Sequence, residues 1–139
     1  MYLLDTNVIS EMRKLATRKA DPGVAAWMES IGDAPLFISI ITLMELERGV
    51  LRKERLDARQ GAMLRHWFDH LVKAQFRQKT LYLDETTASL CAALHVPDKS
   101  PENDAWIGAT ALRHNLTLVT RNIRDFKDMG VRVLNPFTE

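Results

Sequence analysis

The sequence has few of the features that mark secreted and membrane proteins. Its 139 residues include one cysteine, Cys91, which excludes an internal disulfide and is typical of a reducing compartment. No segment approaches the ~20 apolar residues that a membrane-spanning helix requires. Asp5 and Glu11 interrupt the apolar stretch near the N-terminus, so no secretory signal is expected there. We therefore expect a cytoplasmic protein with no membrane partner.

The sequence also has no strong excess of charge, no internal repeat and no low-complexity segment. Its formal net charge is +1, which excludes no class of partner because a balanced total can hide a local patch. The four histidines do not have the spacing of a zinc site. His66 and His70 stand four positions apart without a third ligand nearby, so we interpret them as surface groups. The length predicts a single domain over residues 1–139.

One segment, residues 48–65, is clearly basic. Only Glu54 and Asp57 offset its cationic residues, which are Arg48, Arg52, Lys53, Arg55, Arg59 and Arg65. A solvated helix face explains such a segment, and so does a track for a polyanion such as a nucleic acid. The sequence leaves both interpretations open.

Short apolar runs alternate with amphipathic segments along the chain. The runs predict strands at residues 2–4, 36–40, 81–83, 116–120 and 130–134. Helices are expected at residues 8–15, 22–31, 42–51, 57–76, 84–96 and 101–112, with Asp21 and Ser100 as caps before Pro22 and Pro101. This order predicts an α/β fold with a mostly parallel central sheet, helices on both faces and a helical arm at residues 42–76.

Four acidic residues follow strands or begin helices: Asp5, Glu45, Asp104 and Asp125. Each has a local explanation. Asp5 and Asp125 can cap a helix or turn, Glu45 can form a capping box with Thr42, and Asp104 can complement the positive end of its helix. Taken singly, these explanations are favoured.

The four acids together indicate more. Loops that follow parallel strands gather at one end of the sheet, so the four carboxylates are expected to meet there. Uncompensated carboxylates repel one another, and an oxygen-seeking ion such as Mg²⁺ or Mn²⁺ relieves that repulsion. Two further acids lie close to these residues in the sequence but are not assigned to the site. Glu47 is expected to face away from Glu45 on the same helix, whereas Glu102 can approach the site as an outer acceptor.

Four segments, in this order, resemble the motifs of PIN-domain proteins: Leu4–Glu11, Ile41–Gly49, Asn103–Ala111 and Leu118–Phe126. The likeness is closest to the VapC and FitB-like toxins of bacterial toxin–antitoxin pairs, and it covers essentially the whole chain. It implies a PIN-like three-layer α/β/α fold. It also implies a metal-dependent ribonuclease that hydrolyses phosphodiester bonds in RNA with Mg²⁺ or Mn²⁺.

Carried over by position, the resemblance assigns residues to roles. The catalytic acids would be Asp5, Glu45, Asp104 and Asp125, with Asp5 and Asp104 as the innermost metal ligands. Thr6, Asn7, Thr120 and Asn122 would support them. The residues that would contact the RNA backbone are Arg13, Lys14, Arg48, Arg52 and Arg121. The fourth acid is the least defined, because Thr120, Asn122 and Asp125 share one short loop.

The resemblance also implies partners. They are a cognate antitoxin whose tail fills the acidic groove, operator DNA that is bound only through the antitoxin, and a second copy of the chain in a homodimer. Two alternatives stay open. A haloacid-dehalogenase-type phosphatase also begins with an apolar strand that ends in Asp, but it requires a second Asp where this chain has Asn7. A non-catalytic module, dimerising with a DNA-binding antitoxin-like protein, would use the acids only as helix caps.

Overall fold

Five parallel strands form the centre of the computed structural model, which describes residues 1–138. The strands lie in the order β3–β2–β1–β4–β5, and every neighbouring pair is parallel. Their bounds are β1 Tyr2–Leu4, β2 Leu36–Ser39, β3 Thr80–Leu81, β4 Thr117–Val119 and β5 Val133–Leu134. The predicted α/β fold is therefore confirmed, with a sheet that is wholly rather than mostly parallel.

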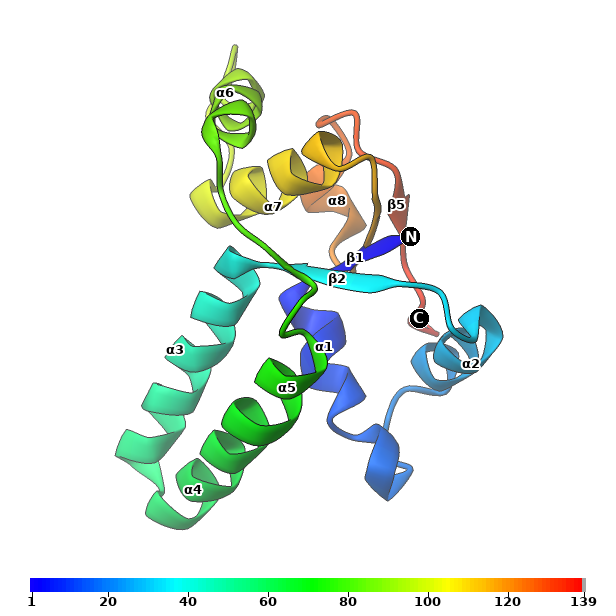
Figure 1. Cartoon of the computed structure of the whole chain (residues 1–139), viewed down its shortest axis with the longest axis vertical. Coiled ribbons are helices and arrows are strands. Elements are labelled where there is room, and N and C mark those ends of the chain that lie inside the picture. Colours follow the sequence, from blue (N-terminus) through cyan, green and yellow to red (C-terminus); the bar gives the residue numbers. More distant parts are fainter. Residues whose placement is uncertain (139) are drawn as a thin grey trace.

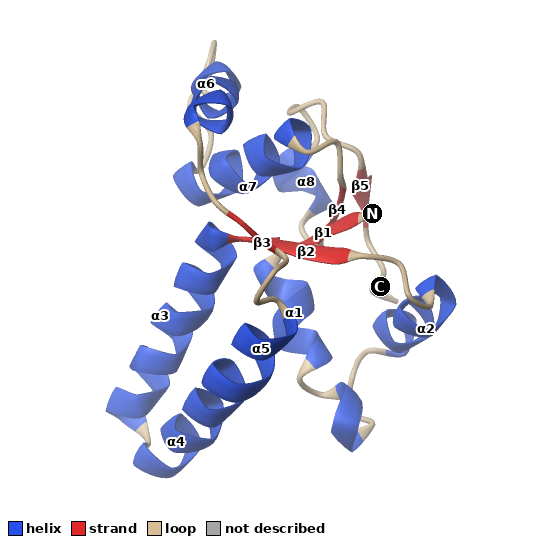
Figure 2. Ribbon diagram, in the orientation of Figure 1, coloured by secondary structure: helices blue, strands red, loops and turns tan. Residues whose placement is uncertain are grey.

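Helices cover both faces of this sheet (Figures 1 and 2). One face carries α1 (Thr6–Met12), the 3-10 turn η1 (Leu15–Thr17), α2 (Pro22–Ile31) and the predicted arm. The arm consists of α3 (Ile40–Leu56), α4 (Ala58–Trp67), the π-helical turn η2 (Phe68–Val72) and α5 (Lys73–Gln75). The other face carries α6 (Glu85–Leu94), α7 (Glu102–Arg113) and α8 (Ile123–Phe126). The result is the expected three-layer arrangement.

The first strand illustrates why the apolar runs are continuous rather than alternating. Successive side chains of a strand point to opposite faces, and both faces of this sheet are covered. Leu3 packs with Ile107 and Phe126 on the side of α7 and α8. Leu4 packs with Val8 and other apolar residues on the side of α1 and the arm. Both leucines are fully buried, so the strand joins the two cores.

Helix α3 begins earlier than the sequence predicted. It starts at Ile40, directly after β2, and the Ser39 hydroxyl caps it by accepting a hydrogen bond from the Ile41 N–H at 3.0 Å. Thr42 is consequently inside the first turn, where its buried hydroxyl has no hydrogen-bond partner among the described residues. The capping-box explanation for Glu45 is therefore wrong.

The start of α7 also differs slightly from the prediction. The helix begins at Glu102, with Pro101 just before it rather than as its first residue. Ser100 does not cap the helix, since its hydroxyl donates to the Leu94 carbonyl. Asp104 nevertheless lies in the first turn of α7, as expected.

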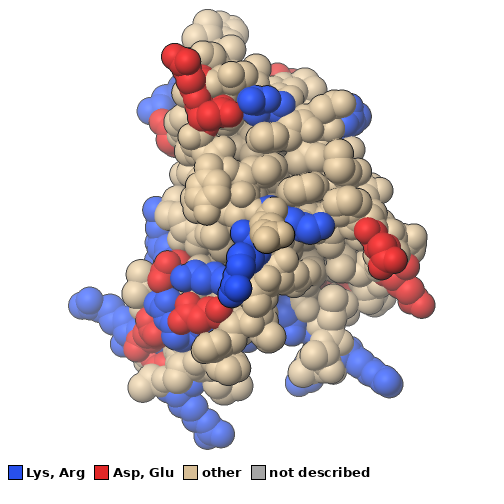
Figure 3. All heavy atoms as spheres, viewed as in Figure 1, with Lys and Arg blue, Asp and Glu red and all other residues tan. Residues whose placement is uncertain are grey.

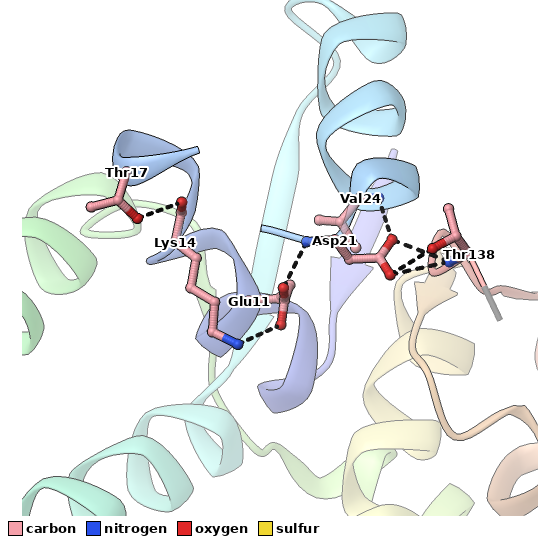
Figure 4. A network of polar contacts seen from close by, with 6 residues as sticks. All are labelled: Glu11, Lys14, Thr17, Asp21, Val24 and Thr138. Carbon is pink, nitrogen blue, oxygen red and sulfur yellow. Dashed lines mark hydrogen bonds and ion pairs between the residues drawn. The ribbon is translucent and has the colours of Figure 1, made fainter. Parts of the chain in front are cut away.

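A polar network fastens the end of the described chain to the first two helices (Figure 4). Asp21 caps α2, as predicted, by accepting from the N–H groups of residues 23 and 24, and it also accepts from the Thr138 N–H and hydroxyl. The Asp21 N–H donates to Glu11 of α1 at 2.8 Å. Only glycine fits at position 23, because a Cβ there would lie 2.3 Å from the Pro136 carbonyl oxygen.

The basic segment at residues 48–65 is partly neutralised by acids of the arm. Arg65 lies 2.8 Å from Glu47, 3.2 Å from Glu54 and 3.6 Å from Asp69. Figure 3 shows basic and acidic side chains interspersed over the arm on this face. Part of the segment is thus a solvated ionic face. Within residues 1–138, no helix is long and apolar enough to cross a membrane.

Candidate active site

The candidate site lies where the order of the strands changes direction across the sheet. Strands β2 and β3 extend the sheet to one side of β1, and β4 and β5 extend it to the other. Asp5 directly follows β1, and Thr120 directly follows β4. The Asp5 N–H donates to the Val119 carbonyl at 2.9 Å, and the Thr120 hydroxyl donates to the Asp5 carboxylate at 2.7 Å. Such switch points are where open α/β sheets bind ligands.

Asp5 is buried and firmly held. Its carboxylate accepts hydrogen bonds from the Thr6 N–H (2.8 Å), the Asn7 side-chain amide (3.3 Å) and the Thr120 hydroxyl (2.7 Å). Burial and repulsion from Glu45 raise the pKa of Asp5, while the three hydrogen bonds act in the opposite direction. Asp5 caps α1, as the local explanation predicted, but the capping hydrogen bond from the Thr6 N–H uses only one of its two carboxylate oxygens.

Glu45 projects from α3 toward the same place. One carboxylate oxygen accepts from the Thr6 hydroxyl, and the other accepts from the Asn103 side-chain amide at 3.2 Å. Three elements that are distant in sequence therefore meet at one carboxylate: the start of α1, the first half of α3 and the first turn of α7. These bonds fix the orientation of Glu45 without neutralising it.

Asp104 differs from both. No hydrogen bond from the described residues reaches its half-buried carboxylate, although it lies one residue after Asn103. Burial, followed by repulsion from Asp5, Asp125 and Glu45, raises its pKa to about 6. Its charge thus interacts with all three of the other predicted acids. The fold therefore brings Asp104 near enough to each of the other three carboxylates for their charges to repel it.

A hollow of about 350 Å³ connects most of these groups. Most of the residues that line it carry side-chain oxygens, and three of these residues are acids. The lining, which also includes two arginines, consists of Asp5, Thr6, Asn7, Glu45, Arg48, Arg52, Asp104 and Asn122. In the described part of the chain, no lysine or arginine makes an ion pair with Asp5, Glu45 or Asp104. The two arginines of the wall thus line the hollow without pairing with its acids.

Asp125 occupies a neighbouring position. It lines an adjoining hollow with Arg121, Asn122 and Arg124, and it is exposed. Asn122 lines both hollows, and its N–H donates to the Thr120 hydroxyl at 3.0 Å. Of the loop residues, Thr120 therefore contacts Asp5 directly, whereas Asp125 acts on Asp104 through its charge.

The donor set fits a hard divalent ion. Carboxylate, hydroxyl and amide oxygens are the ligands that Mg²⁺ and Mn²⁺ prefer. Within residues 1–138, no three of these acids place carboxylate oxygens within 4.8 Å of one another. An ion here would accordingly be held by one or two carboxylates and by water, which is the usual arrangement for Mg²⁺.

The five basic residues that the sequence suggested for RNA contact occupy different places. Arg48 and Arg52 line the acidic hollow itself. Arg13 lines a hollow that also includes Thr6 and Glu45, and its guanidinium lies 5.9 Å from the Trp67 ring centre. Two others are turned to different neighbours. Lys14 pairs with Glu11 at 3.3 Å (Figure 4), and Arg121 stacks on Phe137 at 4.9 Å while its N–H donates to Asn7.

Asn103 had no predicted role, although it is one of the two donors that hold Glu45. The only signal in the sequence was its position beside Asp104 in the opening turn of a helix. Glu47 faces away from the site, as expected, and it pairs with Arg65. Glu102 contacts His95 at 3.1 Å rather than joining the acids.

Comparison with known proteins agrees with this geometry. The sequence model of the PIN domain matches residues 2–131. Toxin FitB of Neisseria gonorrhoeae is 32% identical over 142 residues, which cover 99% of each chain. Ribonuclease VapC14 of Mycobacterium tuberculosis is 49% identical over 71 residues, which cover 51% of this chain and 66% of that protein.

Solved structures give the same result. A structure of FitAB bound to a DNA fragment superposes with a TM-score of 0.85 at 30% identity, covering 100% of this chain and 97% of the other. A toxin–antitoxin complex from Klebsiella pneumoniae superposes with a TM-score of 0.65 at 27% identity and covers 100% of both chains.

Proposed function

Because the chain belongs to the PIN-domain family, among its VapC and FitB-like toxins, we propose that it is a ribonuclease toxin whose acidic hollow holds Mg²⁺ or Mn²⁺ and cleaves RNA. The observation that carries this proposal is Asp104. Its half-buried carboxylate, which receives no hydrogen bond from the described residues, is destabilised by burial and by repulsion from three other acids. A bound cation would remove that penalty.

Some residues of the site would bind the ion, and others orient the residues that bind it. Asp5 and Asp104 would be its direct ligands, and Glu45 and Asp125 would hold its waters. When bound, such an ion lowers the pKa of water and neutralises charge on the phosphate oxygens. Thr120 and Asn7 fix the Asp5 carboxylate, while Thr6 and Asn103 fix Glu45, so the acids are oriented before any ligand arrives.

Arg48 and Arg52 would bind the RNA backbone beside the cleaved bond. Both are exposed and both line the acidic hollow, so a phosphate that reaches the acids also approaches a guanidinium. Arg13 would extend this track along the arm, whereas Lys14 and Arg121 would contribute less because Glu11 and Phe137 already engage them. Each phosphate contact adds to the salt dependence of binding.

The phosphatase alternative has little structural support. Its chemistry requires an acid two positions after Asp5, and the residue there is Asn7. The Asn7 amide is engaged as a brace, because it donates to Asp5 and accepts from the Arg121 N–H. A carboxamide has no titratable proton, so Asn7 cannot supply one to a leaving group.

We further propose that residues 1–139 act as a single domain in the cytoplasm, where RNA and a cognate antitoxin are present. The antitoxin would bind the toxin and connect it to operator DNA, in keeping with the structure of FitAB bound to a DNA fragment. A homodimer would use exposed apolar side chains, of which the arm offers Leu51, Leu56 and Met63.

The test is RNA cleavage by antitoxin-free protein. Single-stranded RNA should be cut with Mg²⁺ or Mn²⁺ and should survive in EDTA. Asp5→Asn and Asp104→Asn should each lower the rate at least ~100-fold, because each removes a charge from the ion site. Glu47→Gln is the matched control, since Glu47 lies on the same helix as Glu45 but pairs with Arg65. It should leave cleavage unchanged.

Two results would contradict the proposal. Cleavage that persists in EDTA would show that no divalent ion takes part. Full activity of folded Asp104→Asn would show that the unpaired carboxylate is not part of the site. Hydrolysis of p-nitrophenyl phosphate without RNA cleavage would instead support the phosphatase.

A further inference from the structure

A second group of metal-binding side chains lies between α6 and α7, away from the acidic hollow. Cys91 is on α6, His95 directly follows that helix, and Glu102 is the first residue of α7. The Cys91 sulfur lies 4.0 Å from the His95 Nε2 atom, which lies 3.1 Å from a Glu102 carboxylate oxygen. Among the described residues, this is the one trio of His, Cys, Asp or Glu whose ligand atoms all lie within 4.8 Å of each other.

The spacing is close to that of a tetrahedral zinc site. Zn–S and Zn–N bonds of about 2.3 and 2.0 Å, at a tetrahedral angle, place sulfur and nitrogen about 3.5 Å apart. The observed separation is 4.0 Å, so contraction by about half an ångström would complete that edge. Cys91 and His95 also stand four residues apart, which places them on one side of a helical turn.

We propose that Cys91, His95 and Glu102 form a second cation site that takes a borderline ion such as Zn²⁺. Its sulfur and nitrogen ligands distinguish it from the all-oxygen hollow around Asp5, which suits harder ions. Three protein ligands leave one tetrahedral position for water or a further ligand. The site is reached through Glu102, which is exposed, while Cys91 is buried behind it.

The hydrogen bonds of His95 define what must change when an ion binds. The Ser100 N–H donates to the His95 Nδ1 atom at 3.0 Å, so the proton of the neutral ring is on Nε2 and points to Glu102. An ion bound at Nε2 would replace the proton there, and that proton would move to Nδ1. The Cys91 thiol also loses its proton, so each bound ion releases one proton to the solvent.

The move of the His95 ring proton connects the second site to the segment that leads into α7. Once Nδ1 carries a proton, it can no longer accept from the Ser100 N–H, and that amide must turn away. Ser100 lies at the end of the 95–101 segment, just before the turn of α7 that carries Asn103 and Asp104. Occupancy of the second site therefore couples to the conformation of residues 96–101 and ties α6 to α7.

Cobalt titration tests the site directly. Untagged, reduced protein is saturated with Mg²⁺ and then titrated with Co²⁺, whose bond to a thiolate gives a near-ultraviolet charge-transfer band. The chain has one cysteine, so this band can arise only at Cys91. We expect the band in the wild type and in Asp104→Asn, which leaves the second site intact. Cys91→Ser should abolish it, and His95→Gln should raise the Co²⁺ Kd at least tenfold.

Absence of the band in folded wild-type protein would overturn the inference. A band that keeps its intensity and midpoint in both His95→Gln and Glu102→Gln would do the same, because it would show cobalt bound by the thiol alone. These two variants decide the question even if Cys91→Ser fails to fold, since both side chains reach the surface. Loss of RNA cleavage in Asp104→Asn bears only on the acidic hollow.

Discussion

Replacing Asp104 with asparagine should make the metal-free protein more stable while it abolishes cleavage. The fold half-buries this carboxylate, gives it no hydrogen bond from the described residues and places three acids where they repel it. Asparagine has nearly the same shape and no charge, so it removes this repulsion without creating a cavity. A carboxylate that served only to cap its helix would not be expected to destabilise the fold in this way.

The size of the effect follows from the pKa of Asp104, which the fold raises from 3.8 to about 6. Each pKa unit corresponds to ~1.4 kcal/mol, which gives a penalty of about 3 kcal/mol for the charged side chain. The side chain is only half-buried, and solvent screening reduces this to roughly 1–2 kcal/mol. For a chain of this size, such a change raises Tm by about 3–7 °C.

The pH dependence has a definite sign. The pKa of Asp104 is higher in the folded state than in the unfolded state, so the folded protein disfavours the charged form. The penalty is fully present above a pH of about 6, and it disappears as the pH falls toward 3.8. The advantage of Asp104→Asn should therefore be largest near neutral pH and should vanish in acid.

Thermal unfolding in EDTA at several pH values measures this difference. The control is Asp33→Asn, which removes a charge from an exposed position outside the hollow and should leave Tm nearly unchanged. Added Mg²⁺ should raise the Tm of the wild type and leave that of Asp104→Asn unaltered. Equal or lower stability of Asp104→Asn in EDTA near neutral pH would refute the reasoning, because it would show that the charged carboxylate does not destabilise the folded state.

Three further substitutions test the supports of the site and the arm. Thr120→Val removes the buried hydroxyl that donates to Asp5, and urea denaturation should show a loss of about 1–3 kcal/mol. Asn103→Leu removes one of the two donors to Glu45, and we expect cleavage to fall roughly tenfold, the scale of one lost hydrogen bond, with little change in Tm. Gly61→Ala would place a Cβ 2.4 Å from backbone of α3, so thermal unfolding should show a loss of about 1–3 kcal/mol.

Each stability prediction in this group has a matched comparison. Thr120→Ser keeps the donor to Asp5 and should retain most of the stability that valine loses. Gly49→Ala is the counterpart of Gly61→Ala, because nothing lies within 4 Å of its added Cβ in the middle of α3. It should stabilise the protein by up to about 1 kcal/mol. A similar loss at both glycines would mean that close approach of α3 and α4 is not what excludes a side chain at position 61.

That Asp5 meets the loop after β4 could be predicted from sequence because it depends on strand ends alone, although the sequence left open whether Thr120, Asn122 or Asp125 points inward. Asp5 follows one predicted strand and Thr120 is the last residue of another, and the carboxyl ends of parallel strands meet at one edge of a sheet. The structure joins them by a hydrogen bond of 2.7 Å. The pairing depends on neither the helix register nor the arm, so errors in helix boundaries did not affect it.

The environment of Glu45 could not be predicted in this way. The pattern after β2 indicated a capping box with Thr42, but Ser39 caps α3 and shifts the start of the helix to Ile40. The donor that does reach Glu45, Asn103, is 58 residues away on a helix that packs on the other face of the sheet. Local pattern cannot supply such a contact, because it depends on how α3 and α7 pack around the strand ends.

The uneven distribution of donors is what separates this site from a set of helix caps. Asp5 receives three hydrogen bonds and Glu45 receives two, whereas Asp104 receives none from the described residues. Asn103 directly precedes Asp104, yet its side-chain amide donates to Glu45. If the acids only capped helices, each would be expected to have its own N–H partner. A carboxylate left without one, whose pKa is raised by burial and by the other acids, gains stability near neutral pH from a ligand that carries positive charge.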